Sequence, residues 1–358
     1  MSRWFKANAK ENPLYELTKK YEDTQIASRL SRRYIELMYG EENCGRCDVN
    51  DFGVEIANQK WFCQGVVMPN TLPPINTPDA LASYREKICS LSSEFKPIMS
   101  FKLYPDMNAD AVRKMVSVGA LVGKLYPTGA TTNSEDGVKS WRQIKEALGA
   151  MSDLGLVLSI HCEKPDAFCL DREFEYHSEF KEIADAFPDL HIVFEHVSDR
   201  RSIDFVASFS DRIAATITAH HLLITLDDLI GGNMNPHNFC KPVVKFDKDR
   251  DALRSAAFSG DKKFFFGSDS APHLKAKKES GSAGGGIYSA PVAVPLIAKL
   301  FDESGKLDKL ENFMSVYGPA FYRIPHADKT VTIKKDTFAI PDEIDGIVPL
   351  FAGKAFNI

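Results

Sequence analysis

LVLSIHCE, residues 156 to 163, and HIVFEHV, residues 191 to 197, are two short apolar runs that each close on a histidine. From about residue 60 the sequence repeats this pattern: an apolar run, a polar or Gly/Pro interruption, then a longer amphipathic stretch. The other runs cover residues 61–70, 95–105, 120–127, 213–220 and 263–273. Continuous apolar runs are typical of parallel strands buried on both faces, and the amphipathic stretches predict helices between them.

Seven such strand and helix units, with one unclear unit before them, predict an α/β fold of the (β/α)8 TIM type whose first strand is atypical. An open doubly wound sheet is the alternative, but no G-x-G-x-x-G follows an early strand. We expect an N-terminal helical extension over residues 1–40 and the barrel over 41–325. A small β appendage over 326–358 would complete the same domain.

Composition excludes several classes of protein. The 358 residues carry a formal net charge of -5, with 44% hydrophobic and 26% charged residues, which is ordinary for a globular protein and does not favour a nucleic-acid partner. The N-terminus has no signal-peptide core and no segment approaches a membrane span, so we predict a cytoplasmic protein without a membrane partner. The seven cysteines are scattered and odd in number, which indicates reduced thiols.

Polar residues close the apolar runs, at the strand ends where barrels carry their chemistry. Each one alone has a simpler explanation, such as a buried core histidine, a helix cap at Asp269 or a lysine that reaches solvent at Lys124. Together they would leave costly unpaired groups unless a metal satisfied them. The residues are Asn70, Lys124, His161, His196, Asp269 and His273.

Two histidines and an aspartate suit zinc, and a catalytic zinc site keeps a position for water. Lys124 is unexpected in such a cluster because an ammonium is repelled by a divalent cation. A neutral amine, however, reacts with carbon dioxide to give a carbamate, which is an anionic oxygen ligand able to bridge two metal ions. The sequence therefore predicts a metal centre at these strand ends, and carboxylation would let Lys124 take part in it.

Longer stretches around these residues resemble the shorter, bacterial-type (class II) dihydroorotases of the amidohydrolase superfamily. They occur in the family's order over roughly residues 60 to 355, and KLYPTGATTNS and GSDSAPH are highly specific together. The matching stretches are VVMPNTLPPINTP, GKLYPTGATTNSEDGV, SIHCE, FEHV, ATITAHHL, IGGNMNPHNFCKP, FGSDSAPHLKAKKES, NFMSVYGPAFYRIP and PLFAG.

The resemblance implies a cyclic amide hydrolase that cyclises N-carbamoyl-L-aspartate reversibly to (S)-dihydroorotate in pyrimidine (UMP) biosynthesis. It implies a zinc-activated hydroxide, with Asp269 as metal ligand and general acid/base. Lys124 would be the carboxylated bridging lysine, and His161 and His196 would bind the second metal. The implied substrate-binding residues are Asn70 and His273 for the carboxylate, Lys241 and Ala290 through the backbone, and Thr131 and Thr132 on a closing loop.

One family motif is missing. The family begins with a strand carrying His-x-His-x-Arg, and this sequence contains no His-x-His. Counting back without gaps places Glu42, Cys44 and Arg46 there, so Glu42 and Cys44 are candidate zinc ligands and Arg46 a candidate carboxylate clamp. The alternative is a solvated loop, because the surrounding EENCGRCDVND is rich in loop formers. Cys44 and Cys47 also form one CxxC pair, which alone is a weak signal.

These observations predict a small-molecule enzyme with two zinc ions per chain if the first site is retained and one otherwise. The alternative is a catalytically impaired paralogue with a binding role, favoured by the missing His-x-His. A homodimer stays open at this level.

Overall fold

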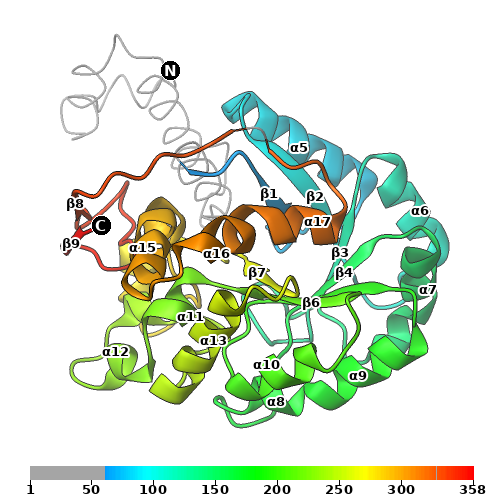
Figure 1. Cartoon of the computed structure of the whole chain (residues 1–358). Coiled ribbons are helices and arrows are strands. Elements are labelled where there is room, and N and C mark those ends of the chain that lie inside the picture. Colours follow the sequence, from blue (N-terminus) through cyan, green and yellow to red (C-terminus); the bar gives the residue numbers. More distant parts are fainter. Residues whose placement is uncertain (1–60, 328) are drawn as a thin grey trace, which may run out of the picture. The chain divides into compact units, whose positions relative to one another are not determined.

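The computed structural model describes residues 61–327 and 329–358, and seven parallel strands form one sheet within them. The strands run side by side in chain order and the sheet curls, with helices α5, α6, α7, α9 and α10 around its outer side (Figure 1). The strands are β1 (Gln64–Val67), β2 (Lys96–Lys102), β3 (Val122–Leu125), β4 (Val157–Ile160), β5 (His191–Phe194), β6 (Ile213–Ile217) and β7 (Phe264–Phe266).

Helices separate the strands, as the amphipathic stretches predicted. Over the first half of the sheet they are α5 (Pro78–Leu91), α6 (Ala109–Ser117), η2 (Trp141–Ile144), α7 (Lys145–Asp153), α8 (Arg172–Glu175), α9 (His177–Ala186) and α10 (Arg200–Ala207). Further along the chain they are α11 (Ala219–Leu223), α12 (Leu226–Ile230), η3 (Pro236–Asn238), α13 (Asp247–Ser259), α14 (Lys275–Lys278), α15 (Ala290–Glu303), α16 (Leu307–Glu311), η4 (Asn312–Val316) and α17 (Tyr317–Tyr322).

Local sequence signals set several helix ends. The Asn108 side chain caps α6 by accepting from the Ala111 amide, and Ser140 opens η2 with a capping box. Gly155, just after the end of α7, has a φ of 68°, a conformation that suits glycine. These helices therefore begin and end where the local residue types favour a helix end.

Side chains on the two faces of each strand pack into two different hydrophobic cores. Residues on the outer face, such as Leu158, Ile192 and Ile217, pack against the helices in the main hydrophobic core. Residues on the inner face form a separate apolar layer inside the sheet, onto which Tyr317, Phe321 and Tyr322 of α17 pack. That layer consists of Ile98, Val122, Val157, Val193, Ala214 and Phe265.

The sheet has two end strands. Within residues 61–327 and 329–358, β1 pairs only with β2 and β7 only with β6, so one place stays between them in a closed eight-stranded ring. Phe62 stacks on Phe266 at 5.8 Å between ring centroids, and the Trp61 indole donates to the Pro291 carbonyl at 2.8 Å. The architecture fits a (β/α)8 TIM-type barrel, and the atypical first strand predicted within residues 41–60 lies outside the described residues.

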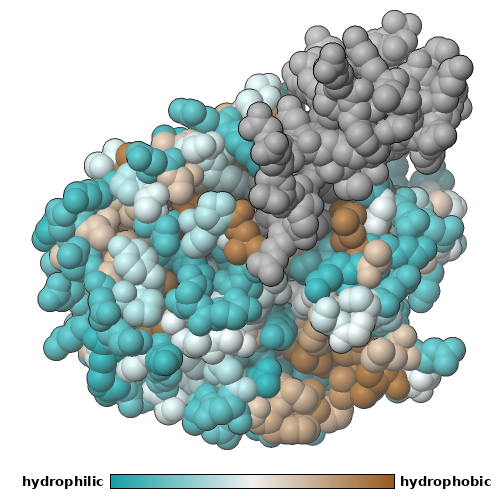
Figure 2. Space-filling model, turned by 180° about the vertical axis from the view of Figure 1, so that it is seen from behind, coloured by the Kyte–Doolittle hydropathy of each residue, from teal (hydrophilic) through white to brown (hydrophobic). Residues whose placement is uncertain are grey.

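Residues near the C-terminus form a small antiparallel pair of strands, β8 (Thr337–Ala339) and β9 (Ala355–Asn357), where the sequence predicted a β appendage. The predicted domain boundaries stay predictions, and the helical extension expected over residues 1–40 lies outside the described residues. The surface seen in Figure 2 is mostly hydrophilic, with hydrophobic residues gathered toward its lower edge. No helix among the described residues is long and apolar enough to cross a membrane.

The aromatic cluster beneath β5 provides a test of the core. Phe180 of α9 is fully buried, with its ring centroid 5.3 Å from that of Phe194 and 5.7 Å from that of Phe205. Phe180→Ala should lower the free energy of unfolding by about 3 to 5 kcal/mol because it leaves a cavity. Urea denaturation measures this loss. The exposed Phe168 is the control, and equal losses for Phe168→Ala and Phe180→Ala would contradict the packing.

Candidate active site

The inner face of the sheet changes from apolar to polar along each strand. Side chains two residues apart point to the same face, so Lys124 follows Val122, Ser159 follows Val157, and Glu195 follows Val193. Because Leu125 pairs with Ile160, and Ile160 with Phe194, the three strands end at one level. The sequence thus brings a layer of buried polar side chains together at the carboxyl ends of the strands.

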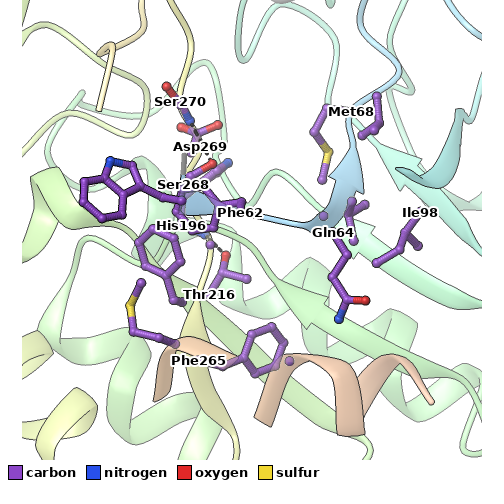
Figure 3. Close-up of a pocket in the computed structure, with 18 of the residues that line it drawn as sticks. Phe62, Gln64, Met68, Ile98, His196, Thr216, Phe265, Ser268, Asp269 and Ser270 are labelled. Atoms are coloured by element: carbon purple, nitrogen blue, oxygen red, sulfur yellow. Dashed lines mark hydrogen bonds between the residues drawn. The ribbon is translucent and has the colours of Figure 1, made fainter. Parts of the chain in front are cut away.

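This polar layer forms the base of a pocket of about 630 Å³. In Figure 3, Asp269, His196 and Thr216 gather at one side of it, and Gln64 and Ile98 lie across from them. Eight of the residues named from the described sequence line the pocket, and Ala290 does not. With Asp269 the predicted lining residues number nine, and these eight are Asn70, Lys124, Thr131, Thr132, His161, His196, Lys241 and His273.

His161 and His196 face each other within the pocket. His161 Nδ1 lies 3.0 Å from His196 Nε2, and the opposite nitrogen of His161, Nε2, lies 2.7 Å from the Glu163 carboxylate. Burial lowers the pKa of both imidazoles, so both favour the neutral form that binds metals. Two lone pairs converging at this separation, with a carboxylate behind one ring, are what a zinc-binding pair requires.

Two of the residues in this cluster have an uncommon backbone conformation. His196 has a φ of 43° and Asp269 a φ of 39°, in the left-handed region that residues other than glycine seldom adopt. Such conformations cost free energy and persist where the surrounding structure imposes them, often at functional sites. Both side chains line the pocket, so the uncommon backbone conformations lie at the candidate site itself.

A hydrogen-bonded network holds the chain at His196. The Thr216 hydroxyl accepts from the His196 amide at 2.6 Å and donates to Glu195 Oε2 at 2.6 Å. Ser159 Oγ donates to the other oxygen of Glu195 at 2.5 Å. The buried Glu195 carboxylate therefore links three strands, β4, β5 and β6, directly beneath the histidine pair.

Lys124 is the cationic member of the cluster. Its side chain is 2% exposed, and no carboxylate lies within ion-pair distance of Nζ among the described residues. Burial is the main reason that the pKa of Lys124 is lowered, although Glu195 and Asp269 act in the opposite direction. A lowered pKa raises the fraction of neutral amine, which is the form able to react with carbon dioxide.

Asp269 carries the carboxyl group that faces this lysine. Burial raises its pKa to about 7, while the Lys124 charge lowers it and Glu195 raises it further. A carboxyl group that titrates near neutrality can both accept and donate a proton under physiological conditions. This property suits the acid-base role predicted for Asp269.

The remaining predicted residues occupy the rim. His273 Nε2 is buried without a hydrogen-bond partner among the described residues, and burial lowers its pKa to about 4. Asn70 Nδ2 donates to the Thr132 carbonyl at 3.4 Å, which joins Asn70 to the loop that carries Thr131 and Thr132, called the threonine loop below. The Ala290 amide donates to Ser270 Oγ at 3.1 Å. Glu42, Cys44 and Arg46 lie outside the described residues.

Comparison with known proteins decides the family. A dihydroorotase of Shewanella sediminis is 41% identical over 309 residues, which cover 83% of this chain and 90% of that protein. The chain belongs to the dihydroorotase family. No protein-family model matches the sequence.

Two solved dihydroorotase structures agree with this assignment. That of Campylobacter jejuni has a TM-score of 0.78 at 36% identity, over 85% of this chain and 90% of that one. That of Saccharomyces cerevisiae, solved in complex with 5-fluoroorotic acid, has a TM-score of 0.77 at 32% identity, over 86% and 91%. Dihydroorotases are cyclic amide hydrolases, so the family and the acid-base chemistry of the pocket agree.

The threonine loop of this chain is attached to the barrel by a buried lysine. Lys102, at the end of β2, is 2% exposed, and its Nζ donates to the Asn133 carbonyl at 2.9 Å and pairs with Asp136. Asn133 Nδ2 in turn donates to the Asn70 carbonyl at 2.9 Å. The Lys102 side chain therefore holds the segment that carries Thr131 and Thr132 against the end of β2.

A second lysine joins two loops on the opposite rim. Lys278 Nζ donates to three carbonyls, those of Phe239, Gly284 and Gly286, at 2.7 to 2.9 Å. Burial lowers its pKa to about 8. The segment over residues 274–286, which is basic and then rich in Gly and Ser, contains α14 and this anchoring lysine.

Sequence reasoning missed several of these supporting residues. Glu163 stands two residues after His161, a spacing that could have indicated a carboxylate partner for the imidazole. Glu195 and Thr216 have no such signal, because their pairing depends on the register between β5 and β6. Lys102 was also unmarked, since a lysine at a strand end usually reaches solvent.

Lys102→Met should loosen the threonine loop. The variant keeps the buried stem and removes the charged donor, so amide hydrogen exchange over residues 128–138 should accelerate by roughly 10-fold or more, as loss of a charged hydrogen bond predicts. Hydrogen exchange read by mass spectrometry measures this. Lys96→Met, at the exposed start of the same strand, is the matched control. Unchanged exchange in Lys102→Met would refute the attachment.

Proposed function

We propose that this chain catalyses the reversible cyclisation of N-carbamoyl-L-aspartate to (S)-dihydroorotate, a step of pyrimidine (UMP) biosynthesis. The observation that carries the proposal is that Lys124, His161, His196 and Asp269, which lie in or just after four different strands, all line one pocket. This donor set provides nitrogen and oxygen ligands beside a carboxyl group that titrates near neutrality.

Zinc fits these residues. His161 Nδ1 and His196 Nε2 would hold one ion, Asp269 another, and a carboxylated Lys124 would contribute an oxygen to each. Bound zinc would polarise the reacting carbonyl and lower the pKa of a water molecule. The buried amine of Lys124, whose lowered pKa increases its neutral fraction, supports the carboxylation: its nitrogen adds to carbon dioxide and releases one proton, which leaves a carbamate with one negative charge.

Asp269 would carry the proton in both directions. In hydrolysis its carboxylate accepts the proton of the attacking water and then donates it to the ring nitrogen as the amide bond breaks. In cyclisation the protonated carboxyl group assists loss of water, and the carboxylate accepts the proton of the attacking nitrogen. Its pKa near 7 leaves both forms populated, which a reversible reaction requires.

The rim would recognise the substrate carboxylate. His273 is neutral at physiological pH and has an unpartnered Nε2 in the pocket wall, so it can donate one hydrogen bond to an anion. Asn70 would donate from its amide, and the main chain at Lys241 and Ala290 would contact the ring. Thr131 and Thr132 would close over the substrate and exclude water. The homodimer and the cytoplasmic location stay predictions.

The reaction is tested with the purified, zinc-loaded chain. It should interconvert N-carbamoyl-L-aspartate and dihydroorotate, and Asp269→Asn should lower kcat by about 10²- to 10⁴-fold because the proton carrier is lost. Asp345 provides a matched control: it also has a positive φ and a pKa raised by burial, and it lies outside the pocket lining. Absence of turnover in the unmodified chain would favour the impaired, binding paralogue instead.

The first metal position is tested separately. We propose that Glu42 and Cys44 replace the missing histidines and that Arg46 holds the substrate carboxylate; the open place between β1 and β7 supports an N-terminal strand there. Glu42→Ala/Cys44→Ala should lower the zinc content by one ion per chain, measured by elemental analysis. Glu41→Ala/Cys47→Ala changes the neighbouring pair of the same types. A content unchanged in the first variant would instead indicate the solvated loop.

A further inference from the structure

Three potential metal ligands meet in a buried cluster behind the pocket wall. His220 and His221 lie on α11, and Cys240 lies 19 residues beyond His221, just before the predicted substrate-contact residue Lys241. One ligand atom from each lies within 4.8 Å of the others, and all three side chains are buried. None of the three residues lines the pocket, although both histidines lie close enough to His196 to contribute to its lowered pKa.

The orientation of the two histidines is unusual. Adjacent residues on a helix normally point in different directions, yet the rings of His220 and His221 have centroids 4.6 Å apart. His221 Nε2 lies 3.9 Å from Cys240 Sγ. Nitrogen and sulfur ligands of one tetrahedral zinc ion stand at nearly this separation, given zinc bonds of about 2.0 and 2.3 Å.

Hydrogen bonding does not explain the burial of the His220 side chain. Its side chain is 0% exposed, and neither ring nitrogen has a hydrogen-bond partner among the described residues. A buried imidazole without partners is costly, because both its donor and its acceptor have lost water. A cation between the three side chains would use the acceptor nitrogen.

His221 is already oriented for such a role. Its Nδ1 lies 2.9 Å from the Thr218 hydroxyl, so the tautomer with a proton on Nδ1 donates there and leaves Nε2 free. In the other tautomer Nε2 donates to the Pro242 carbonyl at 3.1 Å, which also accepts from Cys240 Sγ at 3.1 Å. The Pro242 oxygen therefore stands beside two of the ligands, where it could fill a fourth position.

Charge in the surroundings is compatible with a bound ion. Lys278 and Lys245 are nearby cations among the described residues; the Lys278 ammonium is held by three carbonyls, and Lys245 Nζ donates to Ser198 Oγ at 2.6 Å. Binding of a divalent ion would release the Cys240 proton, so the site would gain one net positive charge. A thiolate with two imidazoles selects borderline or soft metal ions over magnesium or calcium.

We infer that His220, His221 and Cys240 form a structural zinc site, separate from the candidate active site, that attaches α11 to the segment carrying Lys241. The inference does not rest on the proposed function. Its consequence is that one face of the substrate pocket is fixed from behind by a metal ion rather than by packing alone.

Cobalt(II) is the probe that separates this site from the others. A thiolate bound to cobalt(II) gives a charge-transfer band in the near ultraviolet, which a centre of nitrogen and oxygen ligands lacks. The zinc-free full chain should develop this band on titration with cobalt(II), and Cys240→Ser made in the Cys44→Ser/Cys47→Ser background, which lacks the proposed Cys44 ligand, should abolish it. Cys44→Ser/Cys47→Ser should retain it, as should Lys124→Ala/His161→Ala, which disables the candidate active site.

A second variant keeps the test decisive if Cys240→Ser fails to fold. His220→Gln preserves polarity and removes one ligand, so the affinity for cobalt(II) read from the band should fall by more than about 100-fold, beyond what altering an outer partner costs. Cys169→Ser changes an exposed thiol and should have no effect. Absence of a band, or a band lost only in Cys44→Ser/Cys47→Ser, would overturn the inference.

Discussion

The interior of the barrel must accommodate a layer of buried polar groups directly above an apolar one, and the rest of the structure depends on how this is achieved. Val122, Val157 and Val193 fill the lower layer, and the next inward-facing residues are Lys124, Ser159 and Glu195. Buried charged groups are stable only with partners. Glu195 obtains them from two neighbouring strands, whereas Lys124 has a lowered pKa. Glu195 is therefore held by its neighbours, whereas the lowered pKa of Lys124 increases the fraction of neutral amine, the form able to react.

Backbone strain and side-chain networks then act together at the strand ends. His196 and Asp269 are both held at positive φ, and the Thr216 hydroxyl fixes the amide of His196. The convergence of the two imidazoles at 3.0 Å is therefore a property of the folded barrel, sustained by contacts with a neighbouring strand.

The rim of the pocket depends on buried lysines. Lys102 holds the threonine loop, and Lys278 joins two segments through three carbonyls on the opposite rim. An ammonium with several donors suits this role, because one side chain satisfies carbonyls from different loops. The cluster of His220, His221 and Cys240 lies behind the segment that Lys278 also contacts, so that part of the wall is supported from two directions. Such support limits how far the substrate contacts can shift.

The sequence by itself determined the alternation of strands and helices, the helix caps at Asn108 and Ser140, and the polar residues that end the strands, because these depend on local periodicity and residue type. It also identified the family, because long stretches of the sequence match the family's specific motifs in order. Only the tertiary structure decided which polar groups meet: Glu195 with Thr216, Lys102 with the threonine loop, and Cys240 with two histidines of α11. Those pairings arise from strand register and chain crossings between residues distant in sequence, which no local pattern encodes.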